Sequence, residues 1–564
     1  MPVPEFDFSH YFKYDELVGF LQTMVEAYPT LITTETIGKS YEGRDIRIAL
    51  VTNQATGPAL EKPGYWIDAN THAGEVTGSA VALYTIHYLL TSYGSDPQVT
   101  RLLDDYVVYV LPRITVDGSE KYLTTPHMLR SSVRLYPYED ERDGLQRADV
   151  NGDDRILQMR YKDENGAWKA SEKDPRIMRR REPDEFGGTY YSLLPEGLIR
   201  NYDGYEIKIA PAPEGLDFNR NYPYMWAPEG TQYGAGDFPL SEPETRAEAE
   251  FWRTHRNING FLTYHTYAGV ILRPYSTHAD DNFPVEDLDI YKLIGEKGTE
   301  ITGYECVSVF HKFRYHPKEV LHGGMDDYAY DHYGWFGFTT ELWDAPTAAG
   351  VDKGVEKTDY IQWGRWHPEE DDLKLMQWND EKLGGKGFHD WVPFEHPQLG
   401  PVEIGGWDFK YVWQNAPAAY LPELCDRHCR FTIAHALMSP RLGLKQVDVT
   451  HQGADVYRVV AVLENRGFLP TYTSKKGQER NIVRPIRVTL TLPDGGALVT
   501  GPAEQEVGQL EGRANKAFGG FRAPTPTDSR RKVEWVVRAP AGSTAQVTAQ
   551  AERAGTVRAD VPLE

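Results

Sequence analysis

The chain has 564 residues, of which 40% are hydrophobic and 25% are charged, so its composition is that of a globular protein with ample material for a core. Its 60 basic and 83 acidic residues give a net charge of −23, which repels nucleic-acid phosphates and anionic membranes. Because of this charge we do not expect a nucleic-acid partner. No run of eighteen apolar residues occurs, so we expect no membrane-spanning segment either.

The start of the chain and its cysteines bear on the cellular compartment. The first residues, Met1-Pro-Val-Pro-Glu-Phe-Asp, lack the basic and apolar regions of a secretory signal, although removal of a leader would leave the same sequence. Cys425 and Cys429 lie in a predicted helix, Leu424 to Leu437, without the further ligands that a structural zinc needs. With Cys306 they are expected to be free thiols in a cytoplasmic protein.

Strand and helix patterns alternate over the first 130 residues. Apolar residues at helical intervals predict helices at Tyr14 to Tyr28 and at Val76 to Leu90. Apolar runs predict strands at Ile46 to Thr52, Tyr65 to Ala69, Tyr106 to Leu111, Gly260 to Tyr264 and Gly337 to Leu342. This alternation predicts an α/β fold with helices on the faces of the sheet.

Two irregular stretches interrupt the alternation, at about 135–214 and 350–408. The first is polar and lacks long periodic segments, which favours an inserted excursion from the sheet rather than a separate core. It contains a short basic run, Arg179 to Arg181, which is typical of a solvated or ion-paired face and could alternatively form the rim of a site. Loops of this length are uncommon without a function, so both stretches are expected to border a site.

The character of the sequence changes after residue 440. Period-two alternation predicts strands at Gln446 to Val449, Val456 to Leu463, Ile486 to Leu492, Val533 to Val537 and Gln546 to Ala549. Turn sequences such as Pro493-Asp-Gly-Gly separate these strands. The pattern predicts an all-β sandwich over 445–564, following an α/β catalytic domain over 1–440.

Polar residues of chemical interest follow three of the predicted strands. His72 and Glu75 come directly after one strand and before a helix, where open α/β folds place ligands. His265 and Glu341 lie at the ends of two further apolar strands. A histidine in such a place is usually a satisfied core residue, but a buried carboxylate is costly unless it is paired or used. Two histidines and a glutamate are the ligand set of a catalytic zinc.

Several short motifs, taken in order, resemble the M14 zinc carboxypeptidase family. They are His72-x-x-Glu75, Leu111-Pro-Arg-Ile-Thr-Val-Asp117-Gly118, His127-Met-Leu-Arg130, Asp217-Phe-Asn-Arg220-Asn, the distal His265, and Glu341 in Thr-Glu-Leu-Trp. The similarity extends over roughly residues 10 to 440, apart from the two insertions. It implies a central mixed twisted sheet flanked by helices.

The resemblance also implies roles for individual residues. His72, Glu75 and His265 would bind one zinc ion, whose water loses its proton to Glu341. Arg130 would stabilise the oxyanion of the tetrahedral intermediate. Asn219 and Arg220 would hold the free carboxylate of a peptide substrate, and Asp217 would orient His72. The implied reaction is hydrolysis of the C-terminal peptide bond.

The sequence departs from the family pattern at two positions near these motifs. Gly74 stands where the family usually has an arginine, so a contact with the peptide is expected to be lost. The family's mobile tyrosine lies twenty-two residues before the catalytic glutamate, and here that position is Glu319. Tyr315, four residues earlier, could take the role if the loop is shifted.

Asp326 bears on substrate preference. By spacing from Glu341, it falls where family members with a basic preference carry an acidic residue at the floor of the specificity pocket. A buried aspartate facing the pocket would favour a C-terminal lysine or arginine. The alternatives are that Asp326 is solvated or that it caps the following helix.

The segment 149–160 resembles the first half of a calcium-binding loop. Asp149, Asn151 and Asp153 supply oxygens at positions 1, 3 and 5. However, Asp154 stands in place of the usual glycine at position 6, and Arg160 in place of the glutamate at position 12. Both a calcium site and a plain acidic turn are compatible with this pattern.

Two other functions share part of these motifs. An amidase that cuts γ-glutamyl or diaminopimelyl bonds of cell-wall peptides would use the same metal and the same glutamate. A non-catalytic, carboxypeptidase-like binding protein would have no chemical need for intact His72, Glu75, His265 and Glu341. The sequence favours the carboxypeptidase and leaves the oligomeric state open.

Overall fold

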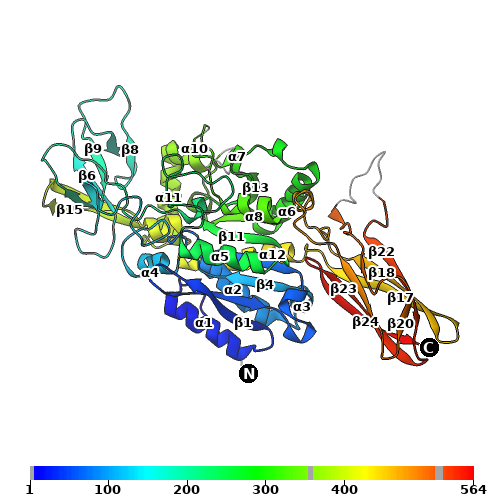
Figure 1. Ribbon diagram of the computed structural model, residues 1–564. Helices are drawn as coiled ribbons and strands as arrows, with labels where there is room; N and C mark the ends of the chain where they lie inside the picture. The colour runs from blue at the N-terminus through cyan, green and yellow to red at the C-terminus, as the bar shows by residue number, and fades with distance from the viewer. Residues whose placement is uncertain (1–4, 317, 354–359, 515–524) are drawn as a thin grey trace.

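An eight-stranded mixed sheet lies at the centre of the protein, in a computed structural model that describes residues 5–316, 318–353, 360–514 and 525–564 (Figure 1). The strand order is β1-β2-β4-β3-β11-β14-β12-β13, and the central neighbours β4, β3, β11 and β14 are parallel. The strands are β1 (Ile32–Lys39), β2 (Asp45–Val51), β3 (Gly64–Ala69), β4 (Val107–Leu111), β11 (Ile258–Thr266), β12 (Val270–Arg273), β13 (Glu305–Ser308) and β14 (Phe336–Leu342). The predicted α/β fold is confirmed.

Helices cover both faces of this sheet because alternate side chains of its strands point to opposite sides. Tyr65 and Ile67 of β3 pack in one apolar core, and Trp66 between them packs in the other. The first core is closed by α1 (Tyr14–Ala27), α2 (Thr77–Ser92), α3 (Pro97–Asp105), α6 (Val285–Thr302) and α12 (Leu421–Ala436). The second is closed by α4 (Val116–Thr124), α5 (Pro243–Thr254) and α8 (Met325–Tyr333). Shorter helices are α7 (Val309–Lys312), α9 (Ala345–Ala348), α10 (Tyr360–Arg365) and α13 (Lys475–Glu479).

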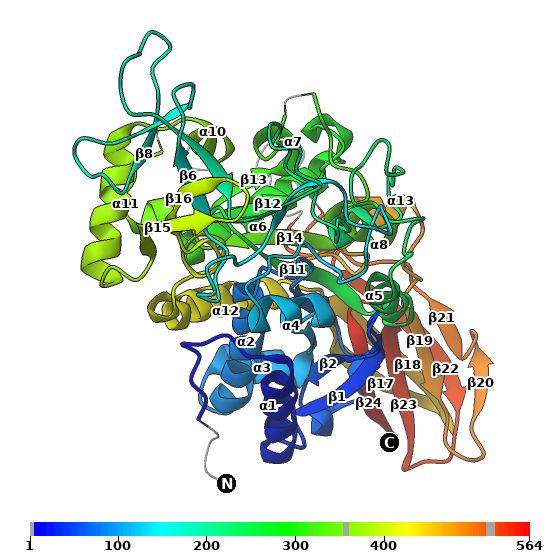
Figure 2. The ribbon, with the colours of Figure 1, turned by 90° about the vertical axis from the view of Figure 1, so that its left-hand side faces the viewer.

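The two predicted insertions join in one additional sheet, which projects from one end of the molecule (Figures 1 and 2). Its order is β15-β16-β6-β9-β7-β8, so strands from both insertions pair directly. The strands are β6 (Gln158–Lys162), β7 (Trp168–Ala170), β8 (Met178–Arg180), β9 (Tyr191–Pro195), β15 (Phe388–His396) and β16 (Gly400–Trp407). A two-stranded ribbon of β5 (Gly144–Arg147) and β10 (Gly197–Arg200) accompanies it.

This inserted sheet corrects the expectation that residues 135–214 have no core of their own. Apolar side chains from both insertions form a separate buried cluster, namely Leu145, Leu157, Met159, Ile199, Val402 and Ile404. Helix α11 (Glu369–Lys382) joins the two insertions through ion pairs such as Arg176 to Asp380. The run Arg179–Arg181 lies in and beside β8, where Arg179 pairs with Glu369. Residues 354–359 of the second insertion lie outside the described residues.

The C-terminal region has two four-stranded antiparallel sheets, which confirms the predicted β-sandwich architecture. The first sheet contains β17 (Leu442–Gly453), β18 (Val456–Asn465), β20 (Ala497–Thr500) and β22 (Arg530–Arg538). The second contains β19 (Arg487–Thr491), β21 (Glu504–Glu506), β23 (Ser543–Ala551) and β24 (Gly555–Leu563). One apolar core, which includes the buried Trp535, lies between them. This region and the inserted sheet lie at opposite ends of the molecule (Figure 1).

Buried polar contacts attach the sandwich to the α/β region. The side chain of Arg553 is almost fully buried, and its Nη2 donates to the carbonyl of Tyr333 at the end of α8 (2.7 Å). The Asn259 amide donates to the carbonyl of Arg553 (2.8 Å), and the Ser474 hydroxyl donates to the carbonyl of Gly334. Within the described ranges, no helix has both the length and the apolar character to cross a membrane.

Candidate active site

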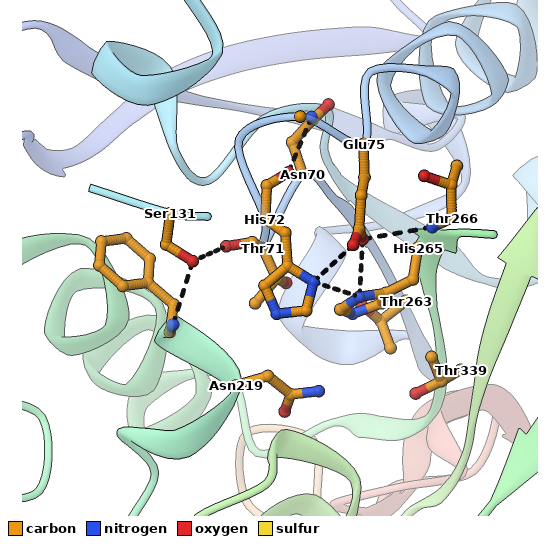
Figure 3. Close-up of polar contacts among 12 residues, drawn as sticks. Asn70, Thr71, His72, Glu75, Ser131, Asn219, Thr263, His265, Thr266 and Thr339 are labelled. Atoms are coloured by element: carbon orange, nitrogen blue, oxygen red, sulfur yellow. Dashed lines mark hydrogen bonds and ion pairs between the residues drawn. The ribbon is translucent and has the colours of Figure 1, made fainter. Parts of the chain in front are cut away.

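The three predicted metal ligands meet at the carboxyl ends of two neighbouring strands (Figure 3). His72 and Glu75 lie in the loop between β3 and α2, and His265 lies near the end of β11. The Nδ1 atoms of the two histidines are 3.0 Å apart. One oxygen of Glu75 is 2.8 Å from His72 Nδ1, and the other is 3.0 Å from His265 Nδ1.

The loop that carries His72 is held by its first residue, Asn70. Asn70 has a φ of 57°, a left-handed conformation that asparagine tolerates better than most residues, and it turns the chain away from β3. The Asn70 amide donates to the carbonyl of His72 (3.2 Å), and Thr115 donates to the carbonyl of Asn70. The Ala73 amide donates to the carbonyl of Arg130 (2.7 Å), which joins this loop to the next motif.

The donor set fits a zinc ion. Two imidazole Nδ1 atoms that face each other at 3.0 Å need a shared cation or proton, and the Glu75 carboxylate supplies the compensating negative charge. His72 Nε2 is 3.0 Å from an oxygen of Asp217, so a proton on Nε2 leaves Nδ1 as a ligand. Among the described residues, His72, Glu75 and His265 form the one group of three or more potential ligands within 4.8 Å of one another.

Arg130 lies beside this group, on the loop that follows α4. Its Nε and Nη2 donate to one oxygen of Asp217 (3.0 and 2.9 Å), and its Nη1 donates to Glu75 (3.3 Å). The side chain is 38% exposed, so the guanidinium lies at the solvent-accessible border of the site and is not buried in the core. A fixed cation at this position can stabilise negative charge that develops beside the metal ligands.

The predicted substrate clamp, Asn219 and Arg220, lies two and three residues after Asp217. Burial alone would raise the pKa of Asp217, but Arg130, Arg220 and His72 hold it well below the ordinary value, so the carboxylate is charged. Asp217 caps the short turn of residues 218–220 by accepting from the Asn219 amide (2.9 Å). Arg220 is largely buried, and its Nη1 donates to the carbonyl of Asn219 (2.7 Å). The side chain of Asn219 lies below the two histidines in Figure 3, across them from Glu75.

Glu341 lies in register with His265, because these two residues are direct partners in the parallel pairing of β11 and β14. Burial raises the pKa of Glu341 to about 8, and the negative charge of Glu75 acts in the same direction. The positive charges of His265 and Arg130 oppose this rise. A carboxyl group with a raised pKa next to the metal ligands has the proton affinity that a general base requires.

Asp326 lies in the first turn of α8 and is only 4% exposed, so it is not the solvated residue of the alternative interpretation. The Thr339 hydroxyl donates to its carboxylate (2.7 Å), and Thr339 precedes Glu341 by two residues on the same side of β14. Burial raises the pKa of Asp326, whereas the positive charges of His265 and Arg220 lower it. Asp326 therefore lies on the side of β14 that carries Glu341.

Tyr315 is also brought to the site. Burial raises the pKa of its hydroxyl, and the negative charge of Glu341 acts in the same direction, whereas the positive charges of Arg130 and Arg220 lower it. The residue as a whole remains 48% exposed. The position given by family spacing, Glu319, instead lies in a turn closed by its amide and the carbonyl of His316.

Sequence reasoning missed a segment, just after the second insertion, that reaches the metal loop. The buried Asn415 donates to the carbonyl of Gly74 (2.7 Å) and accepts from the Thr77 amide (3.0 Å), on either side of Glu75. Asn415 lies between the predicted insertion, which ends at residue 408, and the predicted helix that begins at Leu424, and a single asparagine there carries no recognisable pattern.

The candidate calcium loop is held by hydrogen bonds within itself. Asp149 accepts hydrogen bonds from the amides of Gly152 (2.7 Å) and Asp154 (2.8 Å), and Asn151 accepts from the amide of Asp153 (3.0 Å). At position 12, Arg160 pairs with Glu403. These contacts describe a self-capped acidic turn, and calcium binding stays a prediction.

Comparisons with known proteins place the chain in a family. The model of the zinc carboxypeptidase family matches residues 17–350, and a model of a domain of unknown function matches residues 441–562. Carboxypeptidase A2 of Rattus norvegicus is 25% identical over 345 residues, which cover 60% of this chain and 64% of the relative. Carboxypeptidase B of Homo sapiens is 25% identical over 349 residues, with the same coverage.

These relatives are matched only in part, because the chain spans between 47% and 64% of the length of the curated relatives it matches. Among solved structures, bovine thrombin-activatable fibrinolysis inhibitor in complex with tick carboxypeptidase inhibitor has a TM-score of 0.42 and 19% identity, covering 76% of this chain and 98% of that chain. Since the family model matches more than half of the chain, this protein belongs to the zinc carboxypeptidase family.

Proposed function

We propose that the protein is a zinc-dependent carboxypeptidase that removes the last residue from peptides with a free C-terminus. The observation that carries this proposal is the convergence of His72, Glu75 and His265 beside Glu341, in register at adjacent strand ends. Membership of the zinc carboxypeptidase family supports the metal and the reaction class.

The chain's own residues suit the chemistry of peptide hydrolysis. When bound, zinc would supply a water molecule with a pKa lowered toward neutrality and polarise the scissile carbonyl. Glu341 would accept a proton from the attacking water and donate it to the leaving amine. The Arg130 guanidinium would stabilise the negative charge on the former carbonyl oxygen.

The clamp makes an exopeptidase the best-supported reading. Arg220 offers a planar fork that matches a carboxylate, and it lies three residues after Asp217, which contacts the metal ligand His72. Asn219 lies beside it and adds an amide donor. A substrate held here by its free carboxylate would present its last peptide bond to the metal group.

Asp326 supports a preference for a basic C-terminal residue. It is buried, lies on the Glu341 side of β14, and is hydrogen-bonded to the neutral Thr339 rather than to a basic side chain in the described contacts. A lysine or arginine of the substrate would supply a cationic partner for its carboxylate. Peptides that differ only in the last residue test this preference, and faster cleavage after phenylalanine or leucine than after arginine would contradict it.

The proposal is tested by zinc analysis and kinetics on the full chain. The purified protein should contain one zinc ion per chain and hydrolyse N-blocked dipeptides that carry a free C-terminus. Glu341→Gln should retain the zinc and reduce kcat by about 10²- to 10⁴-fold, because it removes the general base. Unchanged turnover in this variant would disprove the proposed mechanism.

The same assay separates the other two candidate functions. Hydrolysis of γ-glutamyl-diaminopimelyl peptides, without hydrolysis of ordinary dipeptides, would identify an amidase. Zinc binding without any turnover would identify a binding protein. The carboxypeptidase requires that amidation of the substrate's terminal carboxyl group abolishes cleavage, because the clamp then has no carboxylate to bind.

A further inference from the structure

A short segment beyond the family-matched range forms part of the metal-binding surroundings. Residues 408–416, which we call the bracing segment, follow β16 and precede α12, and their central part is a π-helical turn, Phe409–Gln414. The family model ends at residue 350, so the family match assigns nothing to this segment.

The bracing segment is fixed to the metal loop by Asn415. The side chain of Asn415 is fully buried and accepts from both the amide and the hydroxyl of Thr77, each at 3.0 Å. Its Nδ2 donates to the carbonyl of Gly74 (2.7 Å). Since Gly74 and Thr77 flank Glu75, these bonds hold the segment at a fixed place beside a metal ligand.

Gln414 of this segment fills the space in front of Gly74. A Cβ atom at position 74 would lie 2.7 Å from Gln414 Nε2 and 2.9 Å from a ring carbon of Tyr122, closer than atoms pack. The Tyr122 hydroxyl donates to Gln414 Oε1 (3.0 Å), and both Oε1 and the NH₂ nitrogen of Gln414 lie beside position 74. A larger residue at position 74 would have to displace the end of the Gln414 side chain and the Tyr122 ring, and the Gln414 amide occupies that space here.

Phe409 of the bracing segment forms an aromatic pair with Tyr267. The ring centroids are 5.8 Å apart at an interplanar angle of 81°, and Phe409 remains 37% exposed. Tyr267 directly follows Thr266, whose amide donates to Glu75 Oε2 (3.2 Å). This pair thus adjoins the Glu75 side of the metal group, and Figure 3 shows Asn219 of the clamp across the histidines from Glu75.

This placement determines which part of a peptide would meet the bracing segment. A substrate whose terminal carboxylate is held by Asn219 and Arg220 must extend past the metal group in the opposite direction. The residue before the scissile bond then lies on the Glu75 side, where Phe409, Tyr267 and Gln414 are found.

We propose that the bracing segment forms the subsite for the penultimate residue of the substrate, an inference that rests on the proposed carboxypeptidase function. Phe409 and Tyr267 present apolar ring surface to an aromatic or large apolar penultimate side chain. The amide NH₂ of Gln414 donates to the peptide backbone in place of the family's arginine. The preferred substrates are therefore peptides with a large apolar residue before the C-terminal one.

The test compares two N-blocked dipeptides that share their C-terminal residue and have phenylalanine or glycine before it. The zinc-loaded full chain should cleave the phenylalanine substrate with the higher kcat/KM. Phe409→Ala should lower kcat/KM for that substrate about tenfold, the effect of losing apolar contact in a pocket, and leave the glycine substrate within about twofold. Phe186→Ala, which removes an 86% exposed phenylalanine of the first insertion, is the matched control and should change neither value.

A second variant tests the backbone contact separately. Gln414→Ala should lower kcat/KM for both substrates by about fivefold, the effect of losing one hydrogen bond. The subsite would be overturned if the wild type cleaves both substrates and Phe409→Ala has the same ratio of the two kcat/KM values as the wild type. The proposed carboxypeptidase function would be unaffected by that result. Failure of the wild type to cleave either substrate would instead overturn the proposed function and the subsite together.

Discussion

The metal group and the bracing segment lie side by side but are held in different ways. His265 and Glu341 are residues of central strands, so the backbone hydrogen bonds of the sheet fix their positions. Phe409 and Gln414 belong to a turn outside the sheet, which side-chain bonds of the buried Asn415 attach to the metal loop. His265 and Glu341 are thus fixed by the rigid sheet, whereas the proposed subsite for the penultimate residue is an attached segment.

This difference leads to an expected order of effects. Changes in the strand-end residues should abolish the reaction, because every substrate depends on them. Changes in the residues around them should alter rates, then the choice of substrate, and finally only the stability of the attachment.

The largest effect is expected for His265→Ala. Removal of one of three ligands should lower the zinc content to near zero after dialysis and reduce kcat/KM by more than about 10³-fold, because the zinc-activated water is lost. Metal analysis and dipeptide hydrolysis measure the two effects. His451→Ala, an exposed histidine of the sandwich, is the matched control. A variant that kept stoichiometric zinc would show that His265 is not a ligand.

A smaller effect is expected for Arg130→Ala. Loss of a cation beside the developing oxyanion should reduce kcat by about 10²- to 10³-fold while zinc remains bound. Arg180→Ala, an exposed residue of β8, serves as control for loss of an arginine. A rise in KM with unchanged kcat would contradict the role, since it would mean that Arg130 binds substrate and transition state equally.

Asp326→Asn should change the choice of substrate rather than the rate of the reaction in general. The kcat/KM for a C-terminal arginine should fall about 10- to 100-fold relative to leucine, because the buried carboxylate loses its charge. Asp327→Asn is a close control, since Asp327 is also buried but accepts from Ser276 and Thr277 instead. Equal shifts in both variants would point to damage to α8 rather than to a lost pocket charge.

The strand-end residues could be predicted from the sequence because local patterns encode them. A buried apolar run ending in a histidine or a glutamate predicts both the strand and the place of the polar residue. The inserted sheet could not be predicted in this way. Arg160 of β6 and Glu403 of β16 are bonded neighbours 243 residues apart, and nothing near either residue indicates the other. Asn415 was missed for the same reason, because its partners Gly74 and Thr77 are specified only by the tertiary structure.

Asn415→Ala tests how the bracing segment is attached. The substitution leaves the carbonyl of Gly74 and the donors of Thr77 without their buried partner, so the free energy of unfolding should fall by about 2 kcal/mol. Preference for a penultimate phenylalanine should fall with it, whereas zinc content should not. Urea unfolding measures the stability, and Asn282→Ala, an exposed asparagine, is the control. A stable variant with unchanged preference would show that the segment is held by other contacts.

The smallest expected effect concerns Lys410, which lies inside the bracing segment. Its ammonium donates to the carbonyl of Thr125 (2.8 Å) and lies 4.0 Å from the ring centroid of Tyr122. Burial lowers its pKa from the ordinary value of 10.5 to about 8, against the attraction of Asp408 and Asp154. Below pH 8 the folded and unfolded chains both carry the proton, so the cost of burying the charge applies in full.

Between pH 8 and 10.5 the folded chain loses this proton before the unfolded chain does, and the cost disappears. The wild type should therefore gain stability on the order of 1 kcal/mol relative to Lys410→Met as the pH rises through this window. Urea unfolding of both proteins at pH 7, 8, 9 and 10 gives the difference, in which other titrating groups cancel. If the difference in the free energy of unfolding between the two proteins does not change with pH, the carbonyl groups and the Tyr122 ring keep Lys410 charged. The bracing segment would then be anchored by a buried cation, and its attachment would be as insensitive to pH as the strands that carry His265 and Glu341.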